Sequence, residues 1–366
     1  MMRKRIEQLK YYYEHYERYA TAGALLFGFI FDNLTLTRID RWIDNLLLLT
    51  SLSTVAVCVL VLNLHDAGRI RIRSAHRLDW LLPLIMQFAI GNLFSGYIVF
   101  YIRSGSLAKS WPFLLFLAFF FFGNEVFRSR YQRMAFRTGI FYIALFSFCI
   151  FSVPILFNAT GIWIFLLSGI VSLAVFSGVL YLQFRIAPAY TRGGRPTLIL
   201  TIGSIYALFN IFYFTNIIPP IPLSLKELSL YHNIESSVEG HLYRVTYEPK
   251  RWYEYLPFVR ETYEQMPGMP VYAYSSVFAP TDIRTTIFHR WSYVDAPSGQ
   301  WRSAGTVPFG ILGGRDGGYR GYSIKTGVTP GTWRVEVVTG RGQLLGRKTF
   351  NVVAAKALPT LETGER

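Results

Sequence analysis

The sequence predicts an α-helical transmembrane bundle of seven helices followed by an all-β, sandwich-like C-terminal domain. Three observations lead to this prediction. Seven apolar stretches fill residues 19–218, arginines gather in every second connection between them, and apolar residues alternate with polar ones beyond Val271. With 366 residues and a hydrophobic content of 52%, the chain is too apolar for a single soluble domain.

Residues 1–18 form a charged, tyrosine-rich segment ahead of the first apolar stretch. Ile6, Leu9, Tyr13 and Tyr16 recur there at helical spacing among arginines and lysines. The segment does not fit a cleavable signal peptide, because it is charged and no small-residue cleavage site follows the apolar stretch. We predict that it is an amphipathic segment on the cytoplasmic membrane surface.

The apolar stretches are long enough to cross a bilayer, which takes about 20 mostly apolar residues. The predicted spans are 19–36, 43–64, 79–102, 110–127, 139–158, 162–183 and 196–218. The first span is the least regular, because it is short and carries Asp32 and Asn33 near its outer end. Cys58 and Cys149 lie inside spans and offer neither a disulfide framework nor the spacing of metal ligands.

Arginines mark every second connection between the spans. They are Arg69, Arg71, Arg73 and Arg77, then Arg128, Arg130, Arg133 and Arg137, then Arg185, Arg192 and Arg195. Arginine and lysine are retained on the cytoplasmic side, so this alternation predicts a cytoplasmic N-terminus and a C-terminal domain on the opposite side. It also accounts for most of the net charge of +15 without nucleic acid.

Polar residues within the spans are candidates for a transport site. Asp32, Asn92, Glu125 and Asn210 would supply that site in a transporter or channel. The alternative is that these side chains form hydrogen bonds between helices and hold the bundle together. We favour the structural interpretation, because the sequence shows no internal repeat and no paired broken helices.

The chain after the spans divides into three predicted parts. Residues 219–270 start with a proline-rich exit and are predicted to be a linker or interfacial segment, residues 271–353 a β-sandwich, and residues 354–366 a flexible tail. The expected strands are 271–279, 283–294, 301–311, 319–326, 332–339 and 343–353.

The predicted β-sandwich is basic and aromatic, which makes it a candidate binding surface. Between Arg284 and Lys348 the chain has ten Lys and Arg residues against three Asp and Glu. The candidate contacts are His289, Arg290, Trp291, Arg320, Tyr322 and Arg334. They suit an anionic glycan, a lipid headgroup or an acidic partner protein. Alternatively, the aromatic side chains fill the core and the arginines form a solvated face.

Catalysis is not predicted. His289 is the only histidine of the expected sheet, and it has no cysteine and few carboxylates near it in the sequence. The apolar spans carry none of the sequence motifs of membrane-embedded hydrolases. We therefore expect no enzyme activity, no cofactor and no metal, and the predicted compartment argues against nucleic acid.

Several short sequences resemble a known family. They are Phe31-Asp32-Asn33-Leu34-Thr35-Leu36, Ser110-Trp111-Pro112-Phe113, Gly123-Asn124-Glu125-Val126-Phe127-Arg128, His289-Arg290-Trp291, Tyr319-Arg320-Gly321-Tyr322-Ser323, Gly331-Thr332-Trp333-Arg334-Val335, Gly342-Gln343-Leu344-Leu345-Gly346-Arg347 and Phe350. With them the chain resembles multi-pass inner-membrane proteins of Gram-negative bacteria that end in a domain of unknown function of the 2914 type. The resemblance implies an inner-membrane location with a periplasmic C-terminal domain, and it implies no catalytic residues.

Overall fold

A computed structural model of the whole chain describes most of its residues. These are residues 29–30, 32, 34, 36, 41–70, 75–104, 107–126, 133–219, 222–236, 242–249, 260–266, 268–280, 283–314, 317–355 and 359–366. The segment 1–18, predicted to be amphipathic, lies outside them. The chain divides into two compact units. The helical unit comprises Met1–Ile102, Pro112–Val153 and Ile162–Phe212, and the β unit comprises Arg103–Trp111, Pro154–Gly161 and Tyr213–Arg366.

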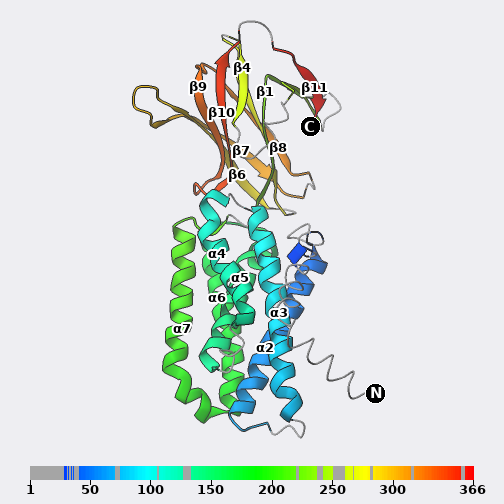
Figure 1. Cartoon of the computed structure of the whole chain (residues 1–366), viewed down its shortest axis with the longest axis vertical. Helices are drawn as coiled ribbons and strands as arrows, with labels where there is room; N and C mark the ends of the chain where they lie inside the picture. The colour runs from blue at the N-terminus through cyan, green and yellow to red at the C-terminus, as the bar shows by residue number, and fades with distance from the viewer. Residues whose placement is uncertain are drawn as a thin grey trace, which may run out of the picture. The chain divides into compact units, whose positions relative to one another are not determined.

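Six helices are present in the described part of the chain (Figure 1). They are α2 (Trp42–Asp66), α3 (Ala75–Ser104), α4 (Leu107–Val126), α5 (Met134–Phe157), α6 (Ile162–Ile186) and α7 (Pro188–Phe214). Five of them are long and apolar enough to cross a membrane, and the apolar part of α4, Ser110–Gly123, is shorter. The predicted count of seven is not matched, and most of the first predicted span, 19–36, lies outside the described residues.

Aromatic side chains fill the interior of the helical unit. Phe146 of α5 is fully buried, and its ring stacks on Tyr206 and Phe209 of α7 at centroid distances of 5.6 and 4.7 Å. The small residue Gly169 of α6 lets the ring of Tyr206 approach, because a Cβ there would lie 3.1 Å from it. Close helix contacts at small residues are typical of membrane proteins.

Eleven strands form the β unit in the described residues. They are β1 (Ser224–Tyr231), β2 (Asn233–Ser236), β3 (Tyr243–Tyr247), β4 (Glu261–Gln265), β5 (Val271–Phe278), β6 (Arg284–Val294), β7 (Trp301–Leu312), β8 (Tyr319–Lys325), β9 (Gly331–Thr339), β10 (Leu344–Ala354) and β11 (Glu362–Glu365). Strands β5 to β10 confirm the six predicted strands to within one residue at each end, because their period-two pattern is long and regular.

These strands form three sheets, with the orders β1-β5-β8, β4-β10-β9-β6-β7 and β11-β3-β2. The five-stranded sheet has β4 at one edge, where it pairs in parallel with β10, and β7 with Pro308 at the other. The first two sheets share two buried clusters, one around Trp291 and Phe350 and one around Ile287 and Val337. The β-rich C-terminal region is thus confirmed. The sandwich stays a prediction, which these shared clusters favour.

Two segments differ from their predicted roles. Residues 219–270, expected to be a linker, contribute β1 to β4, and β1 pairs antiparallel with β5 from Ser224 to Tyr231. Residues 354–366, expected to be a flexible tail, contribute β11, which pairs with β3. Both segments therefore belong to the sheets. Backbone hydrogen bonds join β1 to β5 and β4 to β10, which are predicted strands, whereas β11 pairs with β3, which the sequence does not identify.

Candidate functional site

The six predicted contacts of the β unit do not form one surface. His289 and Trp291 of β6 point into the core, where 0% and 1% of their surfaces are exposed. Arg290 and Arg334 lie on the opposite face of the five-stranded sheet, because side chains alternate along a strand. Arg320 and Tyr322 belong to β8 in the other sheet. The six residues therefore do not share one face, and their role in binding stays a prediction.

His289 is held by two serines in the core between the sheets. Its Nε2 lies 2.8 Å from Ser275 Oγ on β5, and its Nδ1 lies 2.9 Å from Ser323 Oγ on β8. The indole N–H of Trp291 donates to the same Ser323 Oγ at 3.0 Å. Burial lowers the pKa of His289 to about 4, so the imidazole is neutral at physiological pH. This closed network ties the two sheets together and offers no access to a ligand.

Tyr322 lies in a cluster of tyrosines rather than on an open surface. Its ring is 5.6 Å from Tyr243 of β3 and 6.2 Å from Tyr272 of β5. Arg320 is two residues away on the same face of β8, and its charge acts on the phenol of Tyr274. These residues pack between the β1-β5-β8 sheet and the small β11-β3-β2 sheet.

Arginines gather around one carboxylate on the outer face of the five-stranded sheet. Arg290 of β6 and Arg347 of β10 stand opposite Glu336 of β9 in register. The Arg290 Nε and Nη2 groups donate to Glu336 Oε2 at 2.8 and 2.6 Å, and the Arg347 Nε group donates to Oε1 at 2.7 Å. Burial raises the pKa of Glu336, but the two guanidinium groups outweigh it, and the pKa lies below its usual value.

Arg334 is the third arginine of this face, and it forms no ion pair with Glu336. Its guanidinium lies over the ring of Trp301 with 4.1 Å between Cζ and the ring centroid. It makes no hydrogen bond or ion pair with the described residues, and its Nε is buried without a partner. Burial lowers the pKa of Arg334; Glu336 opposes that shift, and the like charges of Arg347 and Arg290 add to it. We name Arg290, Arg334, Arg347, Glu336 and Trp301 the arginine face. Its unused donors suit an anion.

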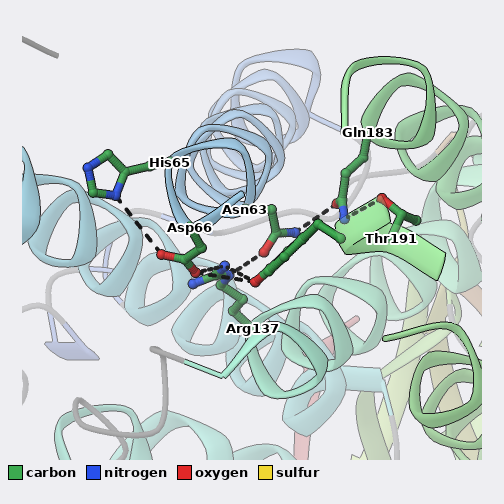
Figure 2. A network of polar contacts seen from close by, with 7 residues as sticks. Asn63, His65, Asp66, Arg137, Gln183 and Thr191 are labelled. Carbon is green, nitrogen blue, oxygen red and sulfur yellow. Dashed lines mark hydrogen bonds and ion pairs between the residues drawn. The ribbon is translucent and has the colours of Figure 1, made fainter. Parts of the chain in front are cut away.

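A second polar network lies in the helical unit (Figure 2). Arg137 of α5 pairs with Asp66 of α2, and its Nε donates to Asn63 Oδ1 at 2.6 Å. Asn63 donates in turn to Gln183 Oε1 of α6 at 2.8 Å, and Gln183 reaches Thr191 of α7 at 3.4 Å. Four helices thus meet at side chains that are almost wholly buried, apart from the half-exposed Asp66. Such a network can fix the helix ends relative to one another.

Sequence reasoning missed this network. The sequence predicts that Arg137 lies in a loop, but α5 begins at Met134 and includes it. Arg192 and Arg195 likewise lie on exposed positions of α7, which begins at Pro188 rather than at residue 196. A signal was available, because a polar residue such as Asn63 or Gln183 inside an apolar span usually has a polar partner.

The predicted intramembrane residues are not brought together by any contact among the described side chains. Asn92 of α3 donates to Ser51 Oγ of α2 at 2.8 Å, which is a bond between helices. Asn210 donates to the carbonyl of Tyr206 within its own helix at 2.8 Å. Asp32 is half-buried, and the side chain of Glu125 in α4 is outside the described set. Within the described residues no group of three or more His, Cys, Asp or Glu could hold a metal ion.

Comparisons with solved structures found distant likenesses. No curated protein matches the chain. Among solved structures, a β-glucosidase from Listeria innocua bound to gluconolactone shares 14% identity at a TM-score of 0.19, covering 35% of this chain and 16% of that chain. The alkylpurine DNA glycosylase AlkC of Pseudomonas fluorescens, bound to DNA, shares 10% identity at a TM-score of 0.22, covering 87% of this chain and 100% of that chain. Likenesses this low carry no argument about fold or function.

The matching family model lies in the C-terminal region. Residues 284–352 match the family described as a protein of unknown function, DUF2914, which confirms the resemblance expected for this region. The match spans strands β6 to β9 and most of β10, and these strands carry every residue of the arginine face. The C-terminal region of this chain therefore carries a DUF2914 domain.

Proposed function

We propose that this chain is a multi-pass inner-membrane protein whose periplasmic β unit binds an anionic envelope component through the arginine face. One observation carries the proposal: Arg334 has no hydrogen-bond or ion-pair partner among the described residues, although its Nε is buried and its ring neighbour Trp301 is partly exposed. A guanidinium that makes no bond to a counter-charge, and whose Nε is shielded from water, is stabilised by an arriving anion.

The chemistry of the face favours carboxylate, phosphate or sulfate groups. The face holds three guanidinium groups and the single carboxylate of Glu336, which binds two of them, so the face keeps an excess of positive charge. Arginine presents its donors as a planar fork that matches the oxygens of such anions, and it stays charged at all physiological pH values. The stack on Trp301 holds the Arg334 fork in one orientation, which reduces the entropy lost on binding.

The basic connections support the proposed side of the membrane. The connection before α5 contains Arg128, Arg130 and Arg133, and Arg185, Arg192 and Arg195 flank the junction of α6 and α7, which favours the cytoplasm for both. Since α7 then crosses once, the β unit reaches the opposite side whether or not the first predicted span, 19–36, crosses. Reporter fusions test this directly. A fusion after Pro222 is expected to report the periplasm and one after Arg77 the cytoplasm, and the same side for both would reject the topology.

The binding proposal is tested with the full-length protein in zwitterionic detergent. Polygalacturonate, phosphatidylglycerol vesicles and an acidic periplasmic protein fraction serve as separate probes, which distinguishes a glycan, a headgroup and a protein as the source of the anion. Arg334→Gln is expected to weaken binding of the preferred probe about tenfold, the usual value of a charge-assisted hydrogen bond. The binding is also expected to weaken as salt rises.

Arg302→Gln is the matched control, because Arg302 is exposed and already paired with Asp295 at 3.1 Å. It should leave binding unchanged. If Arg334→Gln and Arg302→Gln bind every probe as the unchanged protein does, the arginine face is not the site. The alternative function, a transporter or channel that uses Asp32, Asn92, Glu125 and Asn210, has less support. Asn92 and Asn210 already hydrogen-bond to Ser51 and to their own helix.

A further inference from the structure

The β unit contains a cavity of about 330 Å³ that is distinct from the arginine face. Its walls come from β1, β3, β4 and the residues next to them, with the side chain of Arg366 beside β11. This volume lies at the lower end of the range of small-molecule sites, about 300–1,000 Å³. Every lining residue lies outside residues 284–352, in segments that the sequence assigned to a linker and a tail.

Carboxylates line one side of the cavity. Glu227 Oε1 accepts hydrogen bonds from Ser229 Oγ at 3.0 Å, from the Tyr231 hydroxyl at 3.1 Å and from Arg366 Nε at 3.2 Å. Glu248 Oε1 lies 2.7 Å from His232 Nε2 and accepts the backbone N–H of Glu264 at 2.8 Å. All these bonds use one oxygen of each carboxylate. Among the described contacts, the Oε2 atoms of Glu227 and Glu248 accept none, so they remain as acceptors.

Aromatic rings form another side. The imidazole of His232 stacks on the ring of Tyr263, with centroids 4.4 Å apart and planes 14° apart. Tyr231 and Tyr263 are 3% and 4% exposed, so their positions are fixed by packing. Burial raises the pKa of both phenols, and the nearby charges of Glu227 and Glu248 respectively raise it further. Both hydroxyl groups are therefore protonated donors at physiological pH.

We infer that this cavity binds one hydroxyl-rich ring, a neutral monosaccharide unit. The lining offers acceptors in Glu227 and Glu248 and a donor in the guanidinium of Arg366, beside the flat rings of His232 and Tyr263. Hydroxyl groups both donate and accept, so they match this mixture. Anions are disfavoured because the lining holds three carboxylates, Glu227, Glu248 and Glu261, against the guanidinium of Arg366, with Lys348 paired to Glu261 at 2.6 Å. Ammonium ligands are disfavoured because they repel the guanidinium of Arg366 and cannot accept a hydrogen bond from it.

The inference is tested by calorimetric titration of the full-length protein in detergent with glucose and with N-acetylglucosamine. Glucuronate and tetramethylammonium serve as the anionic and cationic comparisons. At least one neutral sugar is expected to bind saturably and more tightly than either comparison. Glu227→Gln keeps the shape of the side chain and removes its charge, and it is expected to weaken sugar binding about tenfold. Glu362→Gln, at an exposed position of β11 outside the lining, should change nothing.

A second pair of variants removes single hydroxyl groups. Tyr247→Phe takes a hydroxyl from the lining and is expected to weaken sugar binding several-fold. Tyr322→Phe removes one from the adjoining tyrosine cluster outside the lining, and it should leave binding unchanged. Preference for glucuronate or tetramethylammonium, no saturable sugar binding by the folded protein, or equal affinity in Glu227→Gln and Glu362→Gln would each overturn the inference. Arg334→Gln separates it from the proposed anion site, since that variant should leave the sugar titration unchanged.

Discussion

The two units bury opposite members of an arginine–carboxylate pair. In the helical unit the cation is inside, with Arg137 2% exposed and its partner Asp66 35% exposed. In the β unit the anion is inside, with Glu336 1% exposed and its partners Arg290 and Arg347 37% and 36% exposed. Removing the exposed partner leaves a buried charge alone, whereas removing the buried partner leaves a charge that water can reach. The two units should therefore respond to opposite substitutions.

The largest effect is expected in the β unit. The double variant Arg290→Gln with Arg347→Gln leaves Glu336 buried without a counter-charge, and it should reduce the free energy of unfolding at pH 7 by about 3–5 kcal/mol. Glu336→Gln should cost less, because it leaves no buried charge. Denaturant unfolding in detergent, followed by tryptophan fluorescence, measures both variants. A larger loss in Glu336→Gln would contradict the expectation that removing the exposed arginines costs more than removing the buried carboxylate.

The stability of the double variant should depend on pH in a direction that the pKa of Glu336 predicts. In the unchanged protein the pKa of Glu336 is depressed, so its contribution is present above the unfolded pKa and is lost as the pH falls through the folded value. Without the guanidinium groups, only burial remains, and burial raises that pKa. The deficit of the double variant should therefore shrink as the pH falls toward 4.

His289 sharpens the comparison, because the β unit buries this second ionisable group without any counter-charge. Its pKa is lowered from about 6.5 to about 4, so its neutral form contributes stability above pH 6.5 that is lost as the pH falls toward 4. The loss should reach about 3 kcal/mol, at about 1.4 kcal/mol per pKa unit. Glutamine does not titrate, so in His289→Gln the free energy of unfolding should depend less on pH between these values. An unchanged slope would assign the effect to another group.

A smaller loss is expected in the helical unit. Asp66→Asn leaves the Arg137 guanidinium buried, but Asn63 and Tyr190 still contact it and water already reaches position 66. We expect a loss of about 2 kcal/mol, below the range for a fully buried pair. Asp295→Asn is the control, since it breaks the exposed pair with Arg302. Thermal unfolding in detergent should separate them, and equal midpoints would mean that Asp66 does not stabilise Arg137.

The smallest effect is expected at Arg334, which belongs to no buried pair. Arg334→Gln removes the stack on Trp301 and should change the free energy of unfolding by less than about 0.5 kcal/mol. The same denaturant experiment measures it. A loss as large as that of the Arg290 and Arg347 double variant would show that Arg334 is part of the structural cluster, and the anion proposal would lose its basis.

The sequence predicts the regular parts of the fold and misses the short ones. Strand β6 follows a period-two pattern over eleven positions, which identified the strand but not the burial of His289 and Trp291, both of which are predicted binding contacts. Strand β11 has the sequence Glu-Thr-Gly-Glu, with no apolar residue, and it is defined only by backbone pairing with β3. Pairing of this kind leaves no side-chain pattern to read.

The candidate sites show the same division. The basic and aromatic character of the β unit is visible in the sequence, but which arginine is already neutralised depends on the register of β6, β9 and β10 around Glu336. The cavity brings Glu227 together with Arg366, which are 139 residues apart in the chain. Arg137 was read as a loop residue because a helix start and a basic connection have similar sequences.

The edge strand β7 bears on how copies of this protein meet one another. An exposed edge invites a strand from a neighbouring molecule, which extends the sheet and leads to aggregation. Pro308 lies near the middle of this strand and has no N–H to offer to such a neighbour, and Gly305 bends the strand at a φ of +125°. The β7 edge thus resists continuation of the sheet. Neighbouring molecules that are crowded together would therefore not join their β units through this edge.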